Sequence, residues 1–176
     1  MSIEAAPELH YITDEAFLAD VRSVARQIGE SDWKPDFVIG IGRGGLVPAV
    51  YISHHADLPM LSIDHSSKVP GFADELLAKV AAKSAAGVKL LFIDDINDSG
   101  GTIAYVRRLL ADNDCEGANL RFAVLINNSR SRATVDYWAQ MIDREEDKRW
   151  FVFPWEAVGT RDTIIEEALS VPERLS

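Results

Sequence analysis

The sequence has a single cysteine, a deficit of basic residues and no long apolar run, and each shortage excludes a class of protein. One cysteine, Cys115, among 176 residues cannot form an intramolecular disulfide, and no Cys/His spacing suggests a zinc site. The formal net charge of −10 argues against binding to nucleic acid or to an anionic membrane, because phosphate-rich partners require clustered Lys and Arg. No segment approaches the roughly 18 apolar residues of a membrane span, and the first residues lack the basic start of a signal peptide. We therefore expect a protein of the reducing cytoplasm whose partners are small molecules.

Apolar runs alternate with helical patterns along most of the chain. Residues 13–31 carry apolar side chains along one helical face, after a Thr or Asp suited to capping. The runs DFVIGIG, MLSID, VKLLFIDD and NLRFAVLINN indicate buried strands, and helices are predicted over 45–56, from about 73, and over 102–113. The tail adds an aromatic strand and a short helix. Together these patterns predict an α/β fold with a mostly parallel twisted sheet flanked by helices. Neither an internal repeat nor a low-complexity linker divides residues 1–176, so one domain is expected.

The stretch KLLFIDDINDSGGTIAYVRRLL places two adjacent carboxylates, Asp94 and Asp95, at the end of a predicted strand. Ligands of open α/β sheets bind at the carboxyl ends of the strands. Glycine N–H groups, hydroxyls and a helix N-terminus suit the following loop to a phosphate; its residues are Asp98, Ser99, Gly100, Gly101 and Thr102. Carboxylates beside a phosphate would repel it unless they face sugar hydroxyls or a bound Mg²⁺. The combination indicates a sugar phosphate with a metal, although DSGGT alone fits a helix cap and a tight turn equally well.

A second glycine-rich turn lies in VIGIGRGGLVPA, where Arg43 stands between Gly42 and Gly44 directly after a predicted strand. A guanidinium on such a turn can bind a multiply charged oxygen cluster such as pyrophosphate. Taken alone, this pattern is more commonly a strand-to-helix turn with a solvated arginine.

The two motifs together resemble those of the type I phosphoribosyltransferases. The signature of that family is an apolar strand, two acidic residues and a small-residue loop, and LLFIDDINDSGGT matches it throughout. GRGGLVPA is similar to the pyrophosphate loop of the xanthine-guanine members. The resemblance covers roughly residues 10–157. It implies a core over about residues 33–130 and a small hood from about residues 1–15 and 131–176.

The resemblance also implies an activity and a set of ligands. The 6-oxopurine members, which the chain resembles most, transfer the 5-phosphoribosyl group from phosphoribosyl pyrophosphate to a purine base, here hypoxanthine, guanine or xanthine. The products are a nucleoside monophosphate and pyrophosphate. The implied cofactor is Mg²⁺, and the implied assembly is a homo-oligomer.

Residue roles follow from the same resemblance. Asp94 and Asp95 would contact the ribose hydroxyls, partly through Mg²⁺, and the 98–102 loop would bind the 5′-phosphate. Arg43, with the neighbouring Gly44, would stabilise the departing pyrophosphate. Asp98 is the candidate proton acceptor near N7 of the purine, so Arg43 and Asp98 are the candidate catalytic residues.

The base site is predicted in DKRWFVFPWE, near the end of the chain. Trp150 is the candidate stacking platform, main-chain atoms of Phe151 would read the exocyclic group, and Glu156 would either do the same or anchor the tail. Similar enzymes place a Lys after the strand 119–128, where this chain has Asn128. Asn both donates and accepts whereas Lys only donates, so the identity of the base stays open. An arginine of the adjoining SRSR segment is an alternative donor.

Residues 64–86 occupy the position of the family's flexible catalytic loop, with Ser66, Ser67 and Lys68 as candidate pyrophosphate contacts. Two other classes of protein remain as alternatives. A receiver-type signalling domain also gathers acids around Mg²⁺, but its acidic pair lies near the start of the chain. A regulatory protein of the same fold would bind phosphoribosyl pyrophosphate or nucleotides without turnover.

Overall fold

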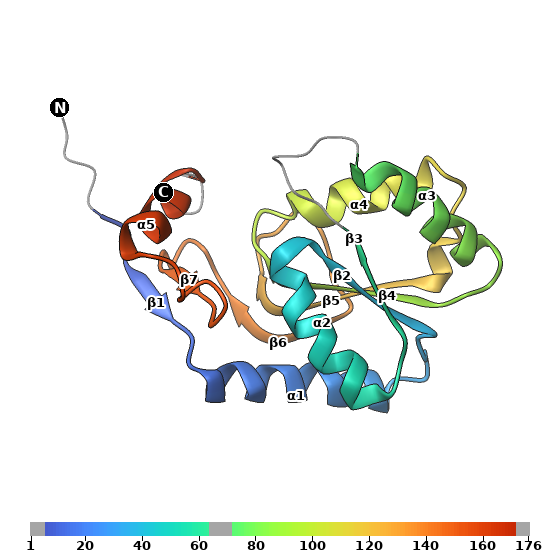
Figure 1. Cartoon of the computed structure of the whole chain (residues 1–176), viewed down its shortest axis with the longest axis horizontal. Helices are drawn as coiled ribbons and strands as arrows, with labels where there is room; N and C mark the ends of the chain where they lie inside the picture. The colour runs from blue at the N-terminus through green and yellow to red at the C-terminus, as the bar shows by residue number, and fades with distance from the viewer. Residues whose placement is uncertain (1–5, 64–71, 172–176) are drawn as a thin grey trace.

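The core of the molecule is a five-stranded parallel sheet, seen in a computed structural model that describes residues 6–63 and 72–171 (Figure 1). The strand order is β3-β2-β4-β5-β6. These strands are β2 (Phe37–Ile41), β3 (Met60–Ile63), β4 (Leu90–Asn97), β5 (Leu120–Asn128) and β6 (Tyr137–Ile142). All four pairings between neighbours are parallel, which confirms the predicted α/β fold.

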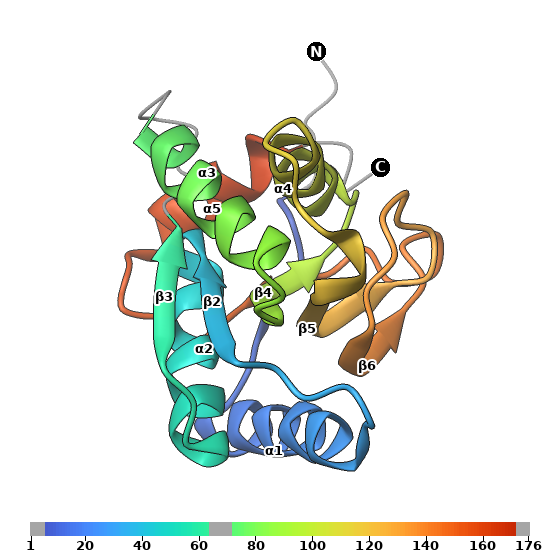
Figure 2. The same cartoon turned by 90° about the vertical axis from the view of Figure 1, so that its right-hand side faces the viewer.

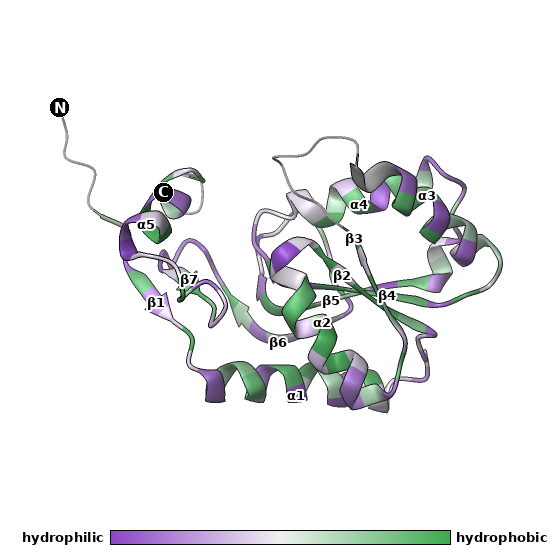
Figure 3. Ribbon diagram, in the orientation of Figure 1, coloured by the Kyte–Doolittle hydropathy of each residue, from purple (hydrophilic) through white to green (hydrophobic). Residues whose placement is uncertain are grey.

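Helices cover both faces of this sheet (Figures 1 and 2). One face carries α1 (Asp14–Glu30) and α2 (Gly42–Ala56), and the other carries α3 (Phe72–Ala85) and α4 (Gly101–Ala111). Alternation along β4 explains the two cores. Leu91 and Ile93 pack in the cluster that includes α1 and α2, while Leu90 and Phe92 pack in the cluster that includes α3 and α4. Both faces of the central strands are therefore apolar, and the ribbon of these strands is mostly green in Figure 3.

Two helices show how local sequence sets their ends. Thr13 caps α1, because its hydroxyl accepts a hydrogen bond from the Ala16 N–H at 3.1 Å, as the sequence predicts. The α2 helix begins at Gly42, earlier than predicted, so that the glycine-rich turn is its first turn and Pro48 lies inside it. Gly42 has φ of 55°, which allows the chain to leave β2 and enter the helix at once.

A smaller unit forms from the two ends of the described chain. Strand β1 (Leu9–Tyr11) pairs in parallel with β7 (Trp150–Val152), and α5 (Arg161–Leu169) packs beside them. Figure 1 shows this unit to the left of the main sheet, and we call it the hood. The sequence did not predict β1 or β6, and β6, within the range expected for the hood, is the edge strand of the main sheet.

No helix among residues 6–63 and 72–171 is long and apolar enough to cross a membrane. The candidate loop residues Ser66, Ser67 and Lys68 lie outside the described residues.

Candidate active site

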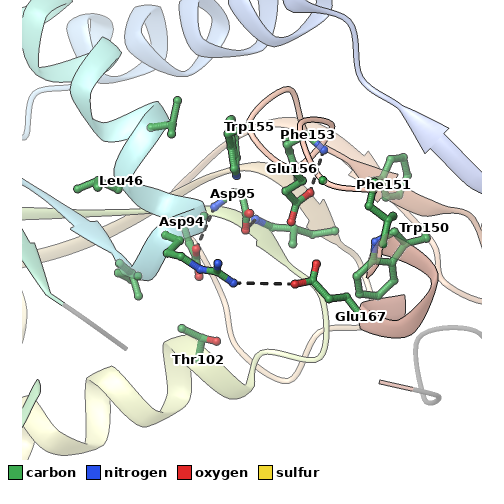
Figure 4. Close-up of a pocket in the computed structure, with 18 of the residues that line it drawn as sticks. Leu46, Asp94, Asp95, Thr102, Trp150, Phe151, Phe153, Trp155, Glu156 and Glu167 are labelled. Carbon is green, nitrogen blue, oxygen red and sulfur yellow. Dashed lines mark hydrogen bonds and ion pairs between the residues drawn. The ribbon is translucent and has the colours of Figure 1, made fainter. Parts of the chain in front are cut away.

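A cavity of about 640 Å³ opens between the carboxyl ends of the strands and the hood (Figure 4). Figure 4 shows Asp94, Asp95 and Thr102 on one side and Trp150, Phe151 and Glu167 on the other. Of the predicted site residues, those that line the cavity are Arg43, Gly44, Asp94, Asp95, Thr102, Trp150, Phe151 and Glu156. The others, which lie outside this lining, are Asp98, Ser99, Gly100, Gly101 and Asn128. The cavity is large enough for a drug-sized ligand.

The acidic pair is held by the backbone at the end of β4. The Asp94 side chain is buried and accepts a hydrogen bond from the Asp95 N–H at 3.0 Å. The Asp95 carboxylate accepts from the Ile96 N–H at 2.7 Å. These bonds fix the direction of both carboxylates, so two anionic groups form part of one wall of the cavity.

The first turn of α2 packs closely against this pair. A Cβ atom on Gly44 would lie 2.6 Å from Cγ of Asp95, so only glycine leaves that carboxylate in place. A Cβ atom on Gly45 would overlap the carbonyl oxygen of Ile93 and lie 3.0 Å from Cα of Asp94. The two glycines therefore have different purposes: Gly44 makes room for a side chain of the site, and Gly45 brings the helix onto the strand.

Arg43 projects from the same turn toward solvent. Its side chain is 88% exposed, and its guanidinium lies 4.0 Å from a carboxylate oxygen of Glu167 on α5. Such an exposed contact is weak, so an incoming anion can displace it. Arg43 is thus available to an anionic ligand at the mouth of the cavity.

The predicted phosphate loop adopts the tight turn that its composition requires. Gly100 has φ of 82°, and a Cβ atom there would lie 2.6 Å from the backbone nitrogen of Ala133. The Ser99 hydroxyl accepts from the Gly101 N–H at 3.4 Å. Thr102, in the first turn of α4, reaches the cavity wall. The positive end of the helix dipole makes this end of the sheet favourable for a phosphate.

Asp98 is buried and bound to an arginine that the sequence analysis missed. The Asp98 side chain is 3% exposed, and Nη2 of Arg144 donates to it at 2.7 Å. Nε of Arg144 adds hydrogen bonds of 3.0 and 3.1 Å to the two Asp98 oxygens. This two-pronged pair means that Asp98 must share its oxygens with Arg144 if it is to accept a proton from a ligand.

Asn128 lies outside the cavity lining and supports the 98–102 loop. Its amide donates to the Asp98 carbonyl oxygen at 3.1 Å, and its own oxygen accepts from the Arg130 and Arg144 N–H groups. The side chain of Arg130 is engaged on the surface with Asp143 and Glu145. The structure thus places Asn128 as a brace for Asp98.

Aromatic residues form the wall opposite the acidic pair. Trp150 is 9% exposed and packs in the small core of the hood while also lining the cavity. Phe151 lies beside it under Arg144, whose guanidinium carbon is 5.2 Å from the ring centre. Trp155 stacks on Phe153 with ring centres 4.8 Å apart. The wall offers flat apolar surface, as an aromatic ligand requires.

Glu156 closes the turn after β7. Its carboxylate accepts a hydrogen bond from the Phe153 N–H at 2.9 Å. Burial raises the pKa of Glu156 to about 7, with the nearby Asp95 and Glu167 charges adding to the effect. Glu156 therefore anchors the turn and presents a group to the cavity that titrates near neutrality.

The α5 helix and the segment before it complete the cavity, with Val158, Gly159, Thr163, Ile164 and Glu167. The sequence analysis assigned no role to this part of the chain. Its apolar side, Ile164 and Ala168, packs on Trp150 and Val152. The pattern is too short to have indicated where the helix would dock.

Known proteins resemble this chain in both sequence and structure. The xanthine-guanine phosphoribosyltransferase of Nitratidesulfovibrio vulgaris is 29% identical over 121 residues, which span 68% of each chain. The xanthine-guanine-hypoxanthine phosphoribosyltransferase of Helicobacter pylori superposes with a TM-score of 0.63 at 24% identity, over 86% of this chain and 95% of that one. A hypothetical protein of Neisseria gonorrhoeae with bound ppGpp superposes with a TM-score of 0.66 at 19% identity, over 95% of this chain and 97% of that one.

A family model extends this likeness across most of the chain. The model of the phosphoribosyl transferase domain matches residues 10–158, which include both strand-end motifs and the aromatic wall. Its match begins at β1 and ends just before α5, so it includes most of the cavity lining but not the part that α5 contributes. The chain therefore belongs to the phosphoribosyl transferase domain family.

Proposed function

We propose that this protein is a purine phosphoribosyltransferase, a glycosyltransferase that moves the 5-phosphoribosyl group from phosphoribosyl pyrophosphate to a purine base. The observation that carries the proposal is one cavity lined by an acidic pair, the first turn of α4 and an aromatic wall. The family of the chain, and relatives named xanthine-guanine phosphoribosyltransferase, support the same reaction.

In this proposal each part of the donor has a place. The 5′-phosphate binds at the 98–102 loop, and the ribose hydroxyls face Asp94 and Asp95. The pyrophosphate lies toward Arg43, whose guanidinium is mostly exposed and held only by a weak contact with Glu167. In this arrangement the carboxylates face the uncharged ribose hydroxyls and the guanidinium faces the pyrophosphate, which limits repulsion between the donor and the protein.

The acidic pair fits Mg²⁺ better than a metal that needs a full protein cage. No group of three or more His, Cys, Asp or Glu side chains gathers for a metal in the described part of the chain. Mg²⁺ is commonly held by one or two carboxylates, with waters and phosphate oxygens as its other ligands. Asp94 and Asp95 would hold it, and it would offset the negative charge that develops on pyrophosphate.

The reaction replaces one bond at the anomeric carbon of the ribose. A nitrogen of the base forms a bond to this carbon while the bond to the pyrophosphate oxygen breaks, and pyrophosphate leaves with the electron pair. Arg43 stabilises that charge, and Asp98 accepts the proton that the base loses. No covalent enzyme intermediate is required, so the main contribution of the protein is to position the reactants.

The setting of the reaction is part of the proposal. The sequence resemblance supports a role in purine salvage and a homo-oligomeric assembly, and the single cysteine is compatible with the reducing cytoplasm. Light scattering on the purified protein measures the assembly directly. Nucleic acid is not an expected partner, since the net charge is −10.

The test is pyrophosphate release from phosphoribosyl pyrophosphate and Mg²⁺, with hypoxanthine, guanine, xanthine and adenine supplied separately. Turnover that depends on a base and falls in Asp98→Asn supports the proposal. Saturable binding of phosphoribosyl pyrophosphate without turnover on any base would instead favour the regulatory alternative.

A further inference from the structure

Arg144 joins two parts of the site that are far apart in the sequence. Its Nε and Nη2 atoms bind the carboxylate of Asp98 at the end of β4, and its Nη1 donates to the carbonyl oxygens of Asp147 at 3.1 Å and Arg149 at 2.7 Å. Arg149 directly precedes Trp150, the first residue of β7. One guanidinium therefore sets the distance between the loop that holds Asp98 and the aromatic wall.

The guanidinium is buried but still reaches the ligand space. The side chain of Arg144 is 11% exposed and lines the cavity beside Trp150 and Phe151. Its hydrogen bonds use the Nε hydrogen, both Nη1 hydrogens and one Nη2 hydrogen. The remaining Nη2 hydrogen has no acceptor among residues 6–63 and 72–171. Because the guanidinium borders the cavity, a ligand that supplies an acceptor here gains a charge-assisted hydrogen bond.

Neither Asn128 nor Arg43 can take this role. The Asn128 amide is bonded to Asp98 and to two backbone N–H groups. Within the described cavity lining, the only cations are Arg43 and Arg144, and Arg43 lies across the cavity at the first turn of α2. Of these two cavity-lining cations, Arg144 is the one that contacts the aromatic wall, at Phe151.

We propose that Arg144 is the specificity-determining residue of the base site, and that it selects purines with an oxo group over purines with an amino group in the same position. This inference rests on the proposed function, since it names the substrate class of that site. Arginine carries donors only, so it pairs with the lone pairs of an oxo oxygen. An exocyclic amino group also presents donors, so neither its hydrogens nor the free Nη2 hydrogen of Arg144 would find an acceptor. Leaving polar groups unpaired in a site without water changes the affinity between two ligands far more than a change in apolar contact does.

The test compares equilibrium binding of inosine monophosphate and adenosine monophosphate, followed by quenching of tryptophan fluorescence. We expect the wild-type protein to bind inosine monophosphate at least about tenfold more tightly, and Arg144→Met to reduce this ratio to near one. Arg144→Lys, which keeps the charge without the fork of donors, should retain part of the preference.

Two controls keep the test decisive. Arg107→Met removes another half-buried arginine, one that stacks on Phe122 at 4.2 Å outside the cavity lining, and it should leave the ratio unchanged. Arg144→Met leaves Asp98 buried without its partner, so it is also made in the Asp98→Asn background and compared with Asp98→Asn alone. The ratio remains measurable there even if the single variant folds poorly.

The outcomes separate the inference from the proposed function. Equal binding of the two nucleotides by the wild type, or a ratio that survives the loss of Arg144, would overturn the inference. A ratio that depends on Arg144, in a protein that never turns over phosphoribosyl pyrophosphate, would uphold the inference and reject the enzyme.

Discussion

Substitution by alanine should have different effects at two neighbouring glycines of α2, lowering ligand affinity at Gly44 and stability at Gly45. At Gly44 an added methyl meets the Asp95 carboxylate, with Cγ at 2.6 Å, and a side chain can rotate away. At Gly45 it meets the Ile93 carbonyl oxygen and Cα of Asp94, which belong to the backbone of a central strand. The obstacle is movable in the first case and fixed in the second.

The magnitudes follow from that difference. Replacing glycine by alanine in a helix gains up to about 1 kcal/mol, and overpacking costs about 1–3 kcal/mol or more. For Gly45→Ala the cost dominates, so we expect a loss of about 2 kcal/mol in the free energy of unfolding. For Gly44→Ala the two effects nearly cancel, and stability should stay within about 1 kcal/mol of wild type. The displaced Asp95 carboxylate should, however, weaken Mg²⁺-dependent binding of phosphoribosyl pyrophosphate at least about tenfold, roughly 1.4 kcal/mol.

Urea unfolding and a binding titration on the two variants measure both quantities. If Gly45→Ala were as stable as wild type, the seating of α2 on β4 would be wrong. If Gly44→Ala bound phosphoribosyl pyrophosphate with wild-type affinity, Asp95 would not contact the donor.

The buried pair, Glu156 and the Arg43 contact give three further predictions. Arg144→Met should lower the free energy of unfolding by about 3 kcal/mol, because it leaves the Asp98 charge buried without a partner. Adding Asp98→Asn removes that charge and should recover part of the loss. Urea unfolding of both variants checks this, and losses that simply add would contradict it. The folded-state pKa of Glu156, about 7, lies above its ordinary value of 4.5, so its contribution to stability is fully present below about pH 4.5 and is lost as the pH rises through 7. Glu156→Gln should therefore gain about 1–3 kcal/mol over wild type between pH 5 and 8 in thermal melts, and parallel pH profiles would refute this. Glu167→Gln should change stability by less than about 0.5 kcal/mol, because its contact with Arg43 is long and exposed, and a large loss in urea unfolding would show that α5 depends on it.

The parts of the fold that the sequence could predict are those with a local signal. The strands β2, β3, β4 and β5 are continuous apolar runs, and the helices between them carry apolar faces. The acidic pair lies near the carboxyl end of β4 and the 98–102 loop follows this strand directly, so topology alone predicts their position at the carboxyl ends of the strands.

The parts that could not be predicted depend on partners far along the chain. The sequence predicts β7 as an aromatic strand, but it predicts neither the three-residue strand β1 nor the pairing of Leu9 with Trp150, which no local pattern specifies. Arg144 lies in the charged run DREEDKR, which is typical of a solvated turn, and only the fold brings it 2.7 Å from Asp98. Its burial depends on β6 pairing with β5, which brings the segment after β6 to Asp98 at the end of β4. The periodicity of the sequence therefore gives no sign of the residue that we propose for base selection.

The most direct test of the central claim is to identify the product. The protein is incubated with phosphoribosyl pyrophosphate, Mg²⁺ and hypoxanthine, and nucleotide and pyrophosphate are measured by chromatography over the same time course. The account predicts inosine monophosphate and pyrophosphate in equal amounts, both lost in Asp95→Asn. Pyrophosphate without nucleotide, or no consumption of the donor with any purine base, would contradict it.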